Sequence, residues 1–124
     1  MSLPKEIIEA WENREGPAVL TTVSSDNLPN SIYATCVSLY EQRVFMVADN
    51  FFDKTRKNIA AEAKATLLFI TKERKSYQVK GAITRHTEGA YFSDMKNWNR
   101  KDLPGHAVAV IEPEEIYSGA KQLM

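Results

Sequence analysis

The sequence predicts a mainly β (α+β) domain, most simply a closed or partly split antiparallel β-barrel of six strands with flanking helices. Two observations carry this prediction: six short segments rich in β-branched and aromatic residues are separated by turn residues, and only three segments have a helical pattern. The chain has 124 residues, which suffices for one hydrophobic core and is too short for a second. We therefore expect a single domain over residues 1–124.

The predicted strands differ in how deeply they should be buried. The run Val44–Ala48 is apolar throughout, which favours burial on both faces. Gly81 interrupts an alternating strand and indicates a bulge or the close approach of another backbone. Pro113 should end the last strand, residues 114–117 should follow as a short extension, and the tail after them is expected to be loose. The six predicted strands cover residues 18–24, 30–40, 44–48, 65–71, 76–87 and 106–112.

Three helices should flank these strands. The first is predicted over residues 4–15, between Pro4 and the Gly16–Pro17 stop, with Trp11 packing it onto the sheet. The second should begin at an Asp53 N-cap and continue to Ala63. The third is indicated by Tyr91, Met95 and Trp98 at helical spacing, a stripe that favours packing first and a subunit contact second.

Basic residues open the second predicted helix, where the positive end of the helix dipole disfavours them. Lys54, Arg56 and Lys57 all fall in its first turn. An anion on the free backbone N–H groups would turn this conflict into attraction, with Lys54 and Arg56 as counter-charges and Thr55 as a hydroxyl donor. Phosphate is the obvious candidate. The alternative is a solvated basic patch that tolerates a small penalty.

Two phenylalanines, Phe51 and Phe52, lie on the turn just before these basic residues. Large apolar side chains on a turn need an apolar partner. A ligand with a phosphate at one end and a flat apolar ring at the other would use both features. Ordinary packing in the core or at a subunit interface is the alternative.

Composition and absent motifs exclude several function classes. Sixteen basic and sixteen acidic residues cancel, so no global field favours nucleic acid or an anionic membrane. The single cysteine, Cys36, allows no internal disulfide, and no membrane-spanning or signal-peptide pattern is visible, so we expect a cytoplasmic protein. His86 and His106 have no partners at metal-ligand spacing. Any redox chemistry therefore requires a bound cofactor.

Four segments occur together in the order typical of one known family: LPNSIYATCV, VFMVADNFFDKTRKNI, YQVKGAI and AVAVIEPEEIY. On these segments the chain resembles the pyridoxamine 5'-phosphate oxidase-like FMN-binding split-barrel proteins, in particular the minimal single-domain members. The resemblance implies a homodimer with two FMN molecules at the subunit interface. It places the FMN phosphate around Lys54 and Thr55, with Asn58 close by.

The resemblance also implies where the rest of FMN would lie. In this family the isoalloxazine ring commonly follows the backbone of the second strand, and residues after the third strand border the ring or the ribityl chain. Trp98 or Tyr91 of the facing subunit is a candidate cover for the flavin. The matching positions of the two strand segments are Tyr33, Ala34, Thr35, Cys36, Ala48, Asp49, Asn50 and Phe51.

The predicted function is that of an FMN-dependent oxidoreductase or electron-transfer flavoprotein with a small-molecule or protein redox partner. The true oxidases of the family carry further substrate-binding residues in a longer C-terminal part, so oxidation of pyridoxamine phosphate is not expected. One alternative is a non-catalytic protein that stores or senses FMN or a related phosphorylated cofactor, including a deazaflavin. Another is a structural dimeric barrel whose basic helix meets an acidic protein partner.

Overall fold

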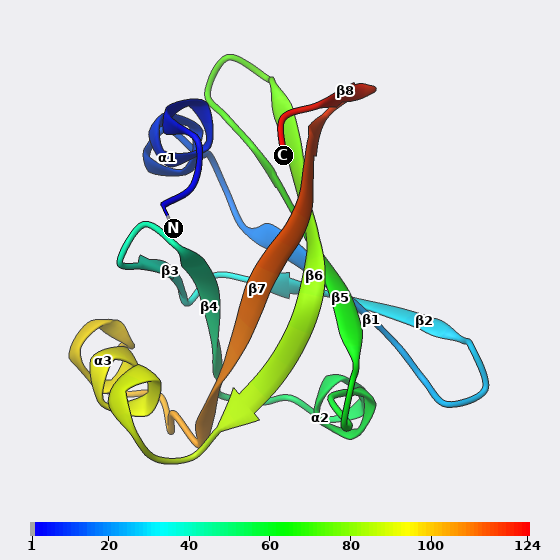
Figure 1. The fold of residues 1–124 in the computed structure, drawn as a ribbon. Helices are drawn as coiled ribbons and strands as arrows, with labels where there is room; N and C mark the ends of the chain where they lie inside the picture. Colours follow the sequence, from blue (N-terminus) through cyan, green and yellow to red (C-terminus); the bar gives the residue numbers. More distant parts are fainter. Residues whose placement is uncertain (1) are drawn as a thin grey trace.

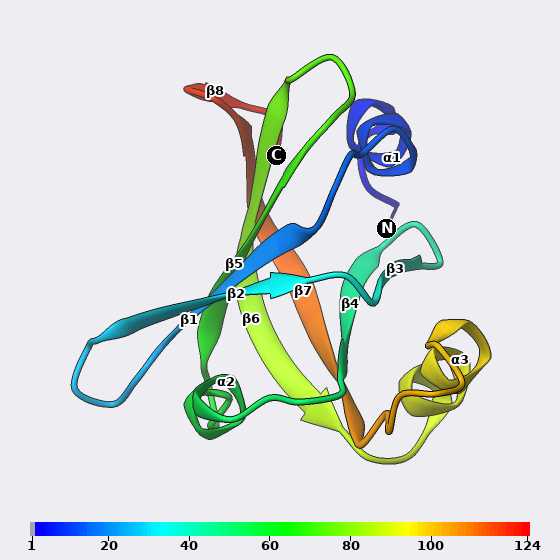
Figure 2. The same cartoon turned by 180° about the vertical axis from the view of Figure 1, so that it is seen from behind.

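The computed structural model describes residues 2–124 as one curled antiparallel sheet with three helices around it (Figures 1 and 2). The strand order is β2-β1-β5-β6-β7-β4-β3, and β8 pairs with β7. The helices are α1 (Lys5–Glu12), α2 (Lys54–Asn58) and α3 (Ala90–Trp98). The strands are β1 (Ala18–Val23), β2 (Pro29–Ala34), β3 (Val37–Tyr40), β4 (Val44–Asp49), β5 (Lys64–Ile70), β6 (Ser76–His86), β7 (Ala107–Ser118) and β8 (Lys121–Gln122).

The barrel is split because the two ends of the sheet, β2 and β3, do not pair with each other. They are consecutive in the chain, and the sequence analysis predicted them as one strand over residues 30–40. The structure corrects this prediction: β2 pairs with β1, whereas β3 pairs with β4, and the chain changes partner at Thr35 and Cys36. The mainly β split-barrel prediction is thus confirmed, but with eight strands in place of six.

The eighth strand comes from the C-terminal tail, which was wrongly predicted to be loose. The backbone N–H of Leu123 donates to the carbonyl of Ile116 at 2.8 Å, and the N–H of Ile116 donates to the carbonyl of Met124 at 2.9 Å. Leu123 also packs against the main core. Backbone pairing and apolar contact therefore hold the tail against β7.

A bulge between β6 and β7 explains both Gly81 and Pro113. Lys80 pairs with Glu115 but Gly81 pairs with Pro113, so Glu114 has no partner of its own in β6. A Cβ atom at Gly81 would lie 1.9 Å from the Glu112 carbonyl oxygen, which confirms the predicted close approach. The prediction that Pro113 ends the strand is wrong, because a proline is tolerated at a bulge where the regular ladder is already interrupted.

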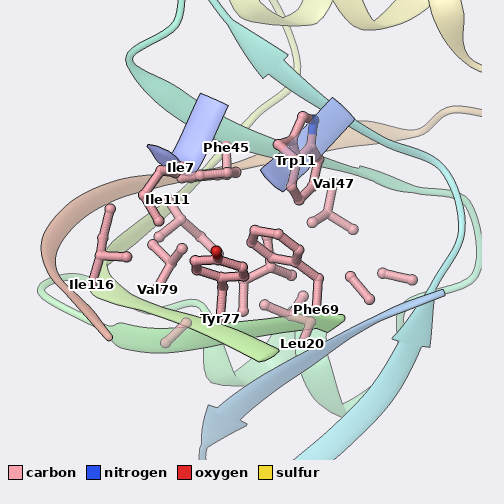
Figure 3. Packing of buried hydrophobic residues seen from close by; sticks show 14 of the residues in the cluster. Ile7, Trp11, Leu20, Phe45, Val47, Phe69, Tyr77, Val79, Ile111 and Ile116 are labelled. Carbon is pink, nitrogen blue, oxygen red and sulfur yellow. The ribbon is translucent and has the colours of Figure 1, made fainter. Parts of the chain in front are cut away.

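The main core fills the inside of the curled sheet and is closed by α1 (Figure 3). Trp11 of α1 contacts Phe45 of β4 and Phe69 of β5 edge-on, with ring centroids 5.0 and 5.1 Å apart. These two strands are not neighbours in the sheet. The tryptophan therefore joins opposite walls of the barrel, as predicted for a packing residue.

A second apolar cluster lies between α3 and the outer face of β4 and β7. Met95 of α3 is fully buried there against residues that include Met46 and Val108. Because Phe45 and Val47 point into the main core, β4 is buried on both faces, as its apolar run predicted. Among residues 2–124, no helix is long and apolar enough to span a bilayer.

Candidate functional site

Two grooves lie at the two ends of β2, which is an edge strand. Its backbone pairs with β1 on one side only, so its other edge presents N–H and C=O groups that no strand satisfies. The groove at the start of β2 has a volume of about 520 Å³, and the groove at its end about 420 Å³. We call them the basic groove and the ring groove, respectively.

The ring groove gathers seven of the residues predicted to surround a flavin ring. Its most exposed large side chains are Tyr33, at 78% exposure, and Phe51, at 77%. Arg100 and Leu103, from the segment after α3, also line it and were missed by the sequence analysis. The predicted residues in this groove are Tyr33, Ala34, Thr35, Cys36, Ala48, Asn50 and Phe51.

A buried amide pair brings the segment after α3 to the ring groove. Asn50 Nδ2 donates to Asn99 Oδ1 at 3.1 Å, and Asn99 Nδ2 donates to Asn50 Oδ1 at 2.9 Å. The backbone N–H of Gly105 donates to the same Asn50 oxygen at 2.9 Å. The Asn50 amide is therefore used to hold residues 99–105 in place. The sequence contained no local signal for this pairing, because its members are 49 residues apart.

Asp49 is engaged in a buried ion pair and does not line the ring groove. Its side chain is 2% exposed, and Oδ2 accepts a hydrogen bond from Arg85 Nε at 2.9 Å and lies 2.7 Å from Arg85 Nη2 in an ion pair. Its other oxygen accepts from the backbone N–H of Phe52 at 3.1 Å. Asp49 thus stabilises the turn before α2. The predicted cap, Asp53, makes no side-chain capping hydrogen bond, so that prediction is wrong.

The helix after this turn is shorter than predicted. It ends at Asn58 rather than near Ala63, and the backbone N–H of Ile59 closes it on the Arg56 carbonyl at 3.2 Å. A helix of five residues aligns few peptide dipoles. The dipole of α2 is therefore too weak to attract an anion by itself, and the attraction has to come from side-chain charge.

The three residues predicted to hold phosphate have different environments. Lys54 lines the basic groove with its side chain 71% exposed. Thr55 is 1% exposed, and its hydroxyl accepts from Asn30 Nδ2 at 3.4 Å. Asn58 lines the groove and donates to Thr22 Oγ1 at 3.1 Å. Thr55 and Asn58 thus fasten α2 to the first two strands. Lys54 Nζ lies 3.9 Å from the Asp53 carboxylate in a solvent-exposed ion pair, which leaves its ammonium group accessible to a ligand.

Trp98 lies apart from both grooves of its own chain. It is half-buried against the cluster under α3, and its Nε1 donates to Asp94 Oδ2 at 3.1 Å. Tyr91 packs edge-on against Tyr40 at 5.1 Å in the same cluster. Whether either residue covers the flavin of a second subunit stays a prediction.

A third hollow of about 500 Å³ adjoins the ring groove, and we call it the arginine cleft. It shares Asn50, Phe51 and Phe52 with the ring groove, and it is lined on its other sides by Arg56 and Arg85 among others. In residues 2–124, no three histidine, cysteine or acidic side chains are grouped so that they could hold a metal ion.

Comparison with known proteins identifies the family to which this chain belongs. The family model described as pyridoxamine 5'-phosphate oxidase matches residues 4–119, and the chain belongs to this family. An uncharacterized protein of Methanocaldococcus jannaschii is 28% identical over 123 residues, which are 95% of this chain and 81% of that protein. The crystal structure of HupZ from Group A Streptococcus is 27% identical, with a TM-score of 0.80, and the alignment covers 94% of this chain and 93% of that one.

Two further solved structures share the fold at lower identity. An FMN-binding protein from Syntrophomonas wolfei has a TM-score of 0.75 at 19% identity, covering 94% of this chain and 91% of that one. HutZ, the heme storage protein of Vibrio cholerae, has a TM-score of 0.66 at 16% identity, covering 95% of each chain. These two likenesses establish the fold alone, so the ligand has to be argued from the grooves.

Proposed function

We propose that this protein binds FMN along β2 as a homodimer and serves as an oxidoreductase or electron-transfer protein. The observation that carries the proposal is the pair of grooves at the two ends of one edge strand. The basic groove is lined by Lys54 and Lys57, and the ring groove carries Tyr33 and Phe51. A ligand with an anionic end and a flat aromatic end matches this arrangement.

The residues present fit FMN in size and in donor chemistry. Each groove has a volume in the range of about 300–1,000 Å³ that is usual for ligand pockets. Lysine is a suitable counter-charge for a phosphate, and Asn58 adds an amide beside it. The unpaired edge of β2 offers backbone donors and acceptors, which a flavin ring needs along its polar rim.

An uncovered apolar row on the outer face of the sheet supports the homodimer. Tyr33 pairs with Val19, and Val19 pairs with Leu68, so the three side chains lie side by side across β2, β1 and β5. Tyr33 is 78% exposed and Leu68 41%. Exposed apolar side chains that form a contiguous patch are typical of an interaction surface. A second copy seated there would bury the row next to the ring groove.

The chain's own contribution to the chemistry would be binding, orientation and exclusion of water. Bound FMN supplies the capacity for hydride or single-electron transfer. The ionisable side chains that line the ring groove are Tyr33, Cys36 and Arg100, and none of them is a carboxylate or an imidazole. The groove therefore suits a reaction in which the protein itself does little general acid–base work.

The first test is the visible absorption spectrum of the purified protein, before and after addition of FMN and removal of the excess by gel filtration. Flavin absorbance that elutes with a dimer is the expected result. Absence of any retained flavin, even from an excess of FMN, would contradict the proposal.

A matched pair of lysine variants tests the phosphate contact. Lys54→Ala should weaken FMN binding about tenfold, which corresponds to about 1.4 kcal/mol and lies at the low end for a charged hydrogen bond because this side chain is exposed. Lys121→Ala, which removes an exposed charge from β8, should leave FMN affinity unchanged. Equal affinities for both variants would remove Lys54 from the phosphate site.

Storage or sensing of the cofactor is the second candidate function, and it is favoured by the same lack of a carboxylate or imidazole in the ring groove. The two functions differ in turnover. Reduction of the bound flavin by NADH or NADPH, followed by reoxidation with an added acceptor, is expected for an oxidoreductase. A flavin that binds tightly and is never reduced by either nucleotide would favour storage.

A further inference from the structure

The arginine cleft collects basic side chains from three separate segments of the chain. Arg56 comes from α2, Arg85 from the end of β6, and His106 from the residue just before β7. Thr87 adds a hydroxyl to the lining of the cleft. The only carboxylate among the lining residues is Asp49, which is 2% exposed.

The Asp49 carboxylate is already neutralised, so it does not repel an incoming anion. Its Oδ2 is bound by Arg85, and its Oδ1 is bound by the backbone N–H of Phe52. One arginine charge balances Asp49, and Arg56 has no ion pair within residues 2–124. The cleft therefore keeps an uncompensated positive charge.

Arg85 is held in a fixed position with donors to spare. A guanidinium group has five N–H donors; the Nε donor is used in the hydrogen bond to Asp49, and Nη2 makes the ion pair with the same oxygen. The side chain remains 17% exposed, and it lines the cleft. An arginine fixed by a buried partner loses little side-chain entropy when it binds an anion, and its planar donors match carboxylate and phosphate oxygens.

The position of the cleft relates it to the ring groove. The two hollows have Asn50, Phe51 and Phe52 in common as a shared wall. A small molecule whose anionic group lies beside Arg85 could therefore extend past Phe51 into the ring groove. The basic groove is lined by none of the arginine-cleft residues, so the two cationic sites are separate.

We propose that the arginine cleft binds the carboxylate or phosphate group of a small-molecule redox partner and places the remainder of that molecule beside the flavin ring. Only the second part of this proposal, the placement of the molecule beside the flavin ring, rests on the proposed FMN function. The anion site itself is defined by Arg56, Arg85 and His106 and can be tested on protein without flavin.

The experiment is an NMR titration of ¹⁵N-labelled protein with inorganic phosphate and, separately, with acetate, following the Arg85 Nε–H signal. It is run on flavin-free protein and again on FMN-saturated protein. Arg85 itself is left intact, because its removal would leave Asp49 buried without a partner. Arg56→Gln and His106→Gln are the test variants, and Lys57→Gln is the matched control from the same helix, since it lines the basic groove instead.

The expected result is a saturable shift of the Arg85 signal that persists when FMN is bound. Arg56→Gln should weaken anion binding about tenfold, the scale of one charged contact, with FMN affinity unchanged. Lys57→Gln should leave the Arg85 titration as it is. His106→Gln, which removes the imidazole ring from the lining of the cleft, should weaken anion binding in the same direction as Arg56→Gln.

Three results would overturn the proposal in distinguishable ways. An Arg85 signal that no anion shifts, in protein that binds FMN normally, refutes the anion site and leaves the FMN function standing. Competition between FMN and phosphate at Arg85 would assign the cleft to the cofactor's own phosphate. Anion binding in a protein that never binds FMN would refute the redox-partner assignment together with the proposed function.

Discussion

Replacing Asp49 with alanine should destabilise the protein by breaking its most buried ion pair. The carboxylate accepts a hydrogen bond from Arg85 Nε at 2.9 Å and one from the Phe52 backbone at 3.1 Å, and Arg85 Nη2 lies 2.7 Å from it in an ion pair. Removing one partner of a fully buried ion pair costs about 3–5 kcal/mol, because the other charge stays behind without compensation. Arg85 is 17% exposed and keeps some contact with water, so the expected cost is about 3 kcal/mol, at the low end.

The reverse variant, Arg85→Met, should lower the free energy of unfolding by more than Asp49→Ala does. It leaves Asp49, which is 2% exposed, without its counter-charge, and we expect about 4 kcal/mol. The double variant should lose less than the sum of the two single losses, because neither charge is left alone. Replacement of a whole buried pair by apolar groups is often close to neutral.

Chemical denaturation at one fixed protein concentration measures all three free energies of unfolding. For a chain of 124 residues a loss of 3 kcal/mol should lower Tm by about 11 °C. The loss of unfolding free energy in the double variant should fall short of the summed single losses by at least about 2 kcal/mol. Strictly additive losses, within about 0.5 kcal/mol, would show that the pair does not act as a unit and would refute the argument.

Two further stability predictions concern the bulge and the first helix. Gly81→Ala should lower the free energy of unfolding by about 1–3 kcal/mol or more, because its Cβ would lie 1.9 Å from a backbone oxygen that cannot rotate away. Wild-type stability of this variant in denaturation experiments would refute the close approach. The pKa of Glu6 is lowered by its hydrogen bond from Lys75 and then by that from Tyr77. A carboxyl group whose pKa is lower in the folded state stabilises the protein above its unfolded-state pKa, and this stabilisation is lost as the pH falls through the folded-state pKa. The decrease in unfolding free energy caused by Glu6→Gln should therefore be complete at pH 7 and should shrink below about pH 4.3. A loss that is constant from pH 7 to pH 3 would contradict this assignment.

Local sequence patterns predicted the elements whose burial or turn chemistry is visible along the chain. The apolar run of β4 is buried on both faces, and the glycine inside β6 lies at a bulge. The same reasoning failed at Pro113, because a proline ends a regular strand but is tolerated where a bulge has already interrupted the ladder. The glycine and the proline belong to one feature that only the pairing of β6 with β7 makes visible.

The break between β2 and β3 was not predictable from local sequence. Thr35 and Cys36 have no turn preference, and the strand ends there because its two halves find different partners. The tail is a similar case, since Leu123 becomes ordered through contacts with Ile116. Strand partnership is a property of the assembled sheet, and single-segment propensity does not contain it.

The candidate site was predicted as a set of residues but not as a geometry. The resemblance to FMN-binding split barrels pointed to Tyr33–Cys36 and Ala48–Phe51, and most of these residues line one groove. It gave no indication that Asp49 would be withdrawn into an ion pair with Arg85. It also missed Arg100 and Leu103, which reach the groove through the Asn50–Asn99 amide pair.

By itself the sequence determined the fold class, the family and the basic segment after the two phenylalanines, because these depend on composition, periodicity and motif order. Only the tertiary structure decided which polar groups are free to meet a ligand. Asp49, Asn50 and Thr55 are buried and are engaged by partners within the fold, whereas Lys54 and Arg56 stay exposed. The reason is that a hydrogen bond or ion pair between distant residues forms only when the folded backbone brings them within about 3 Å of each other.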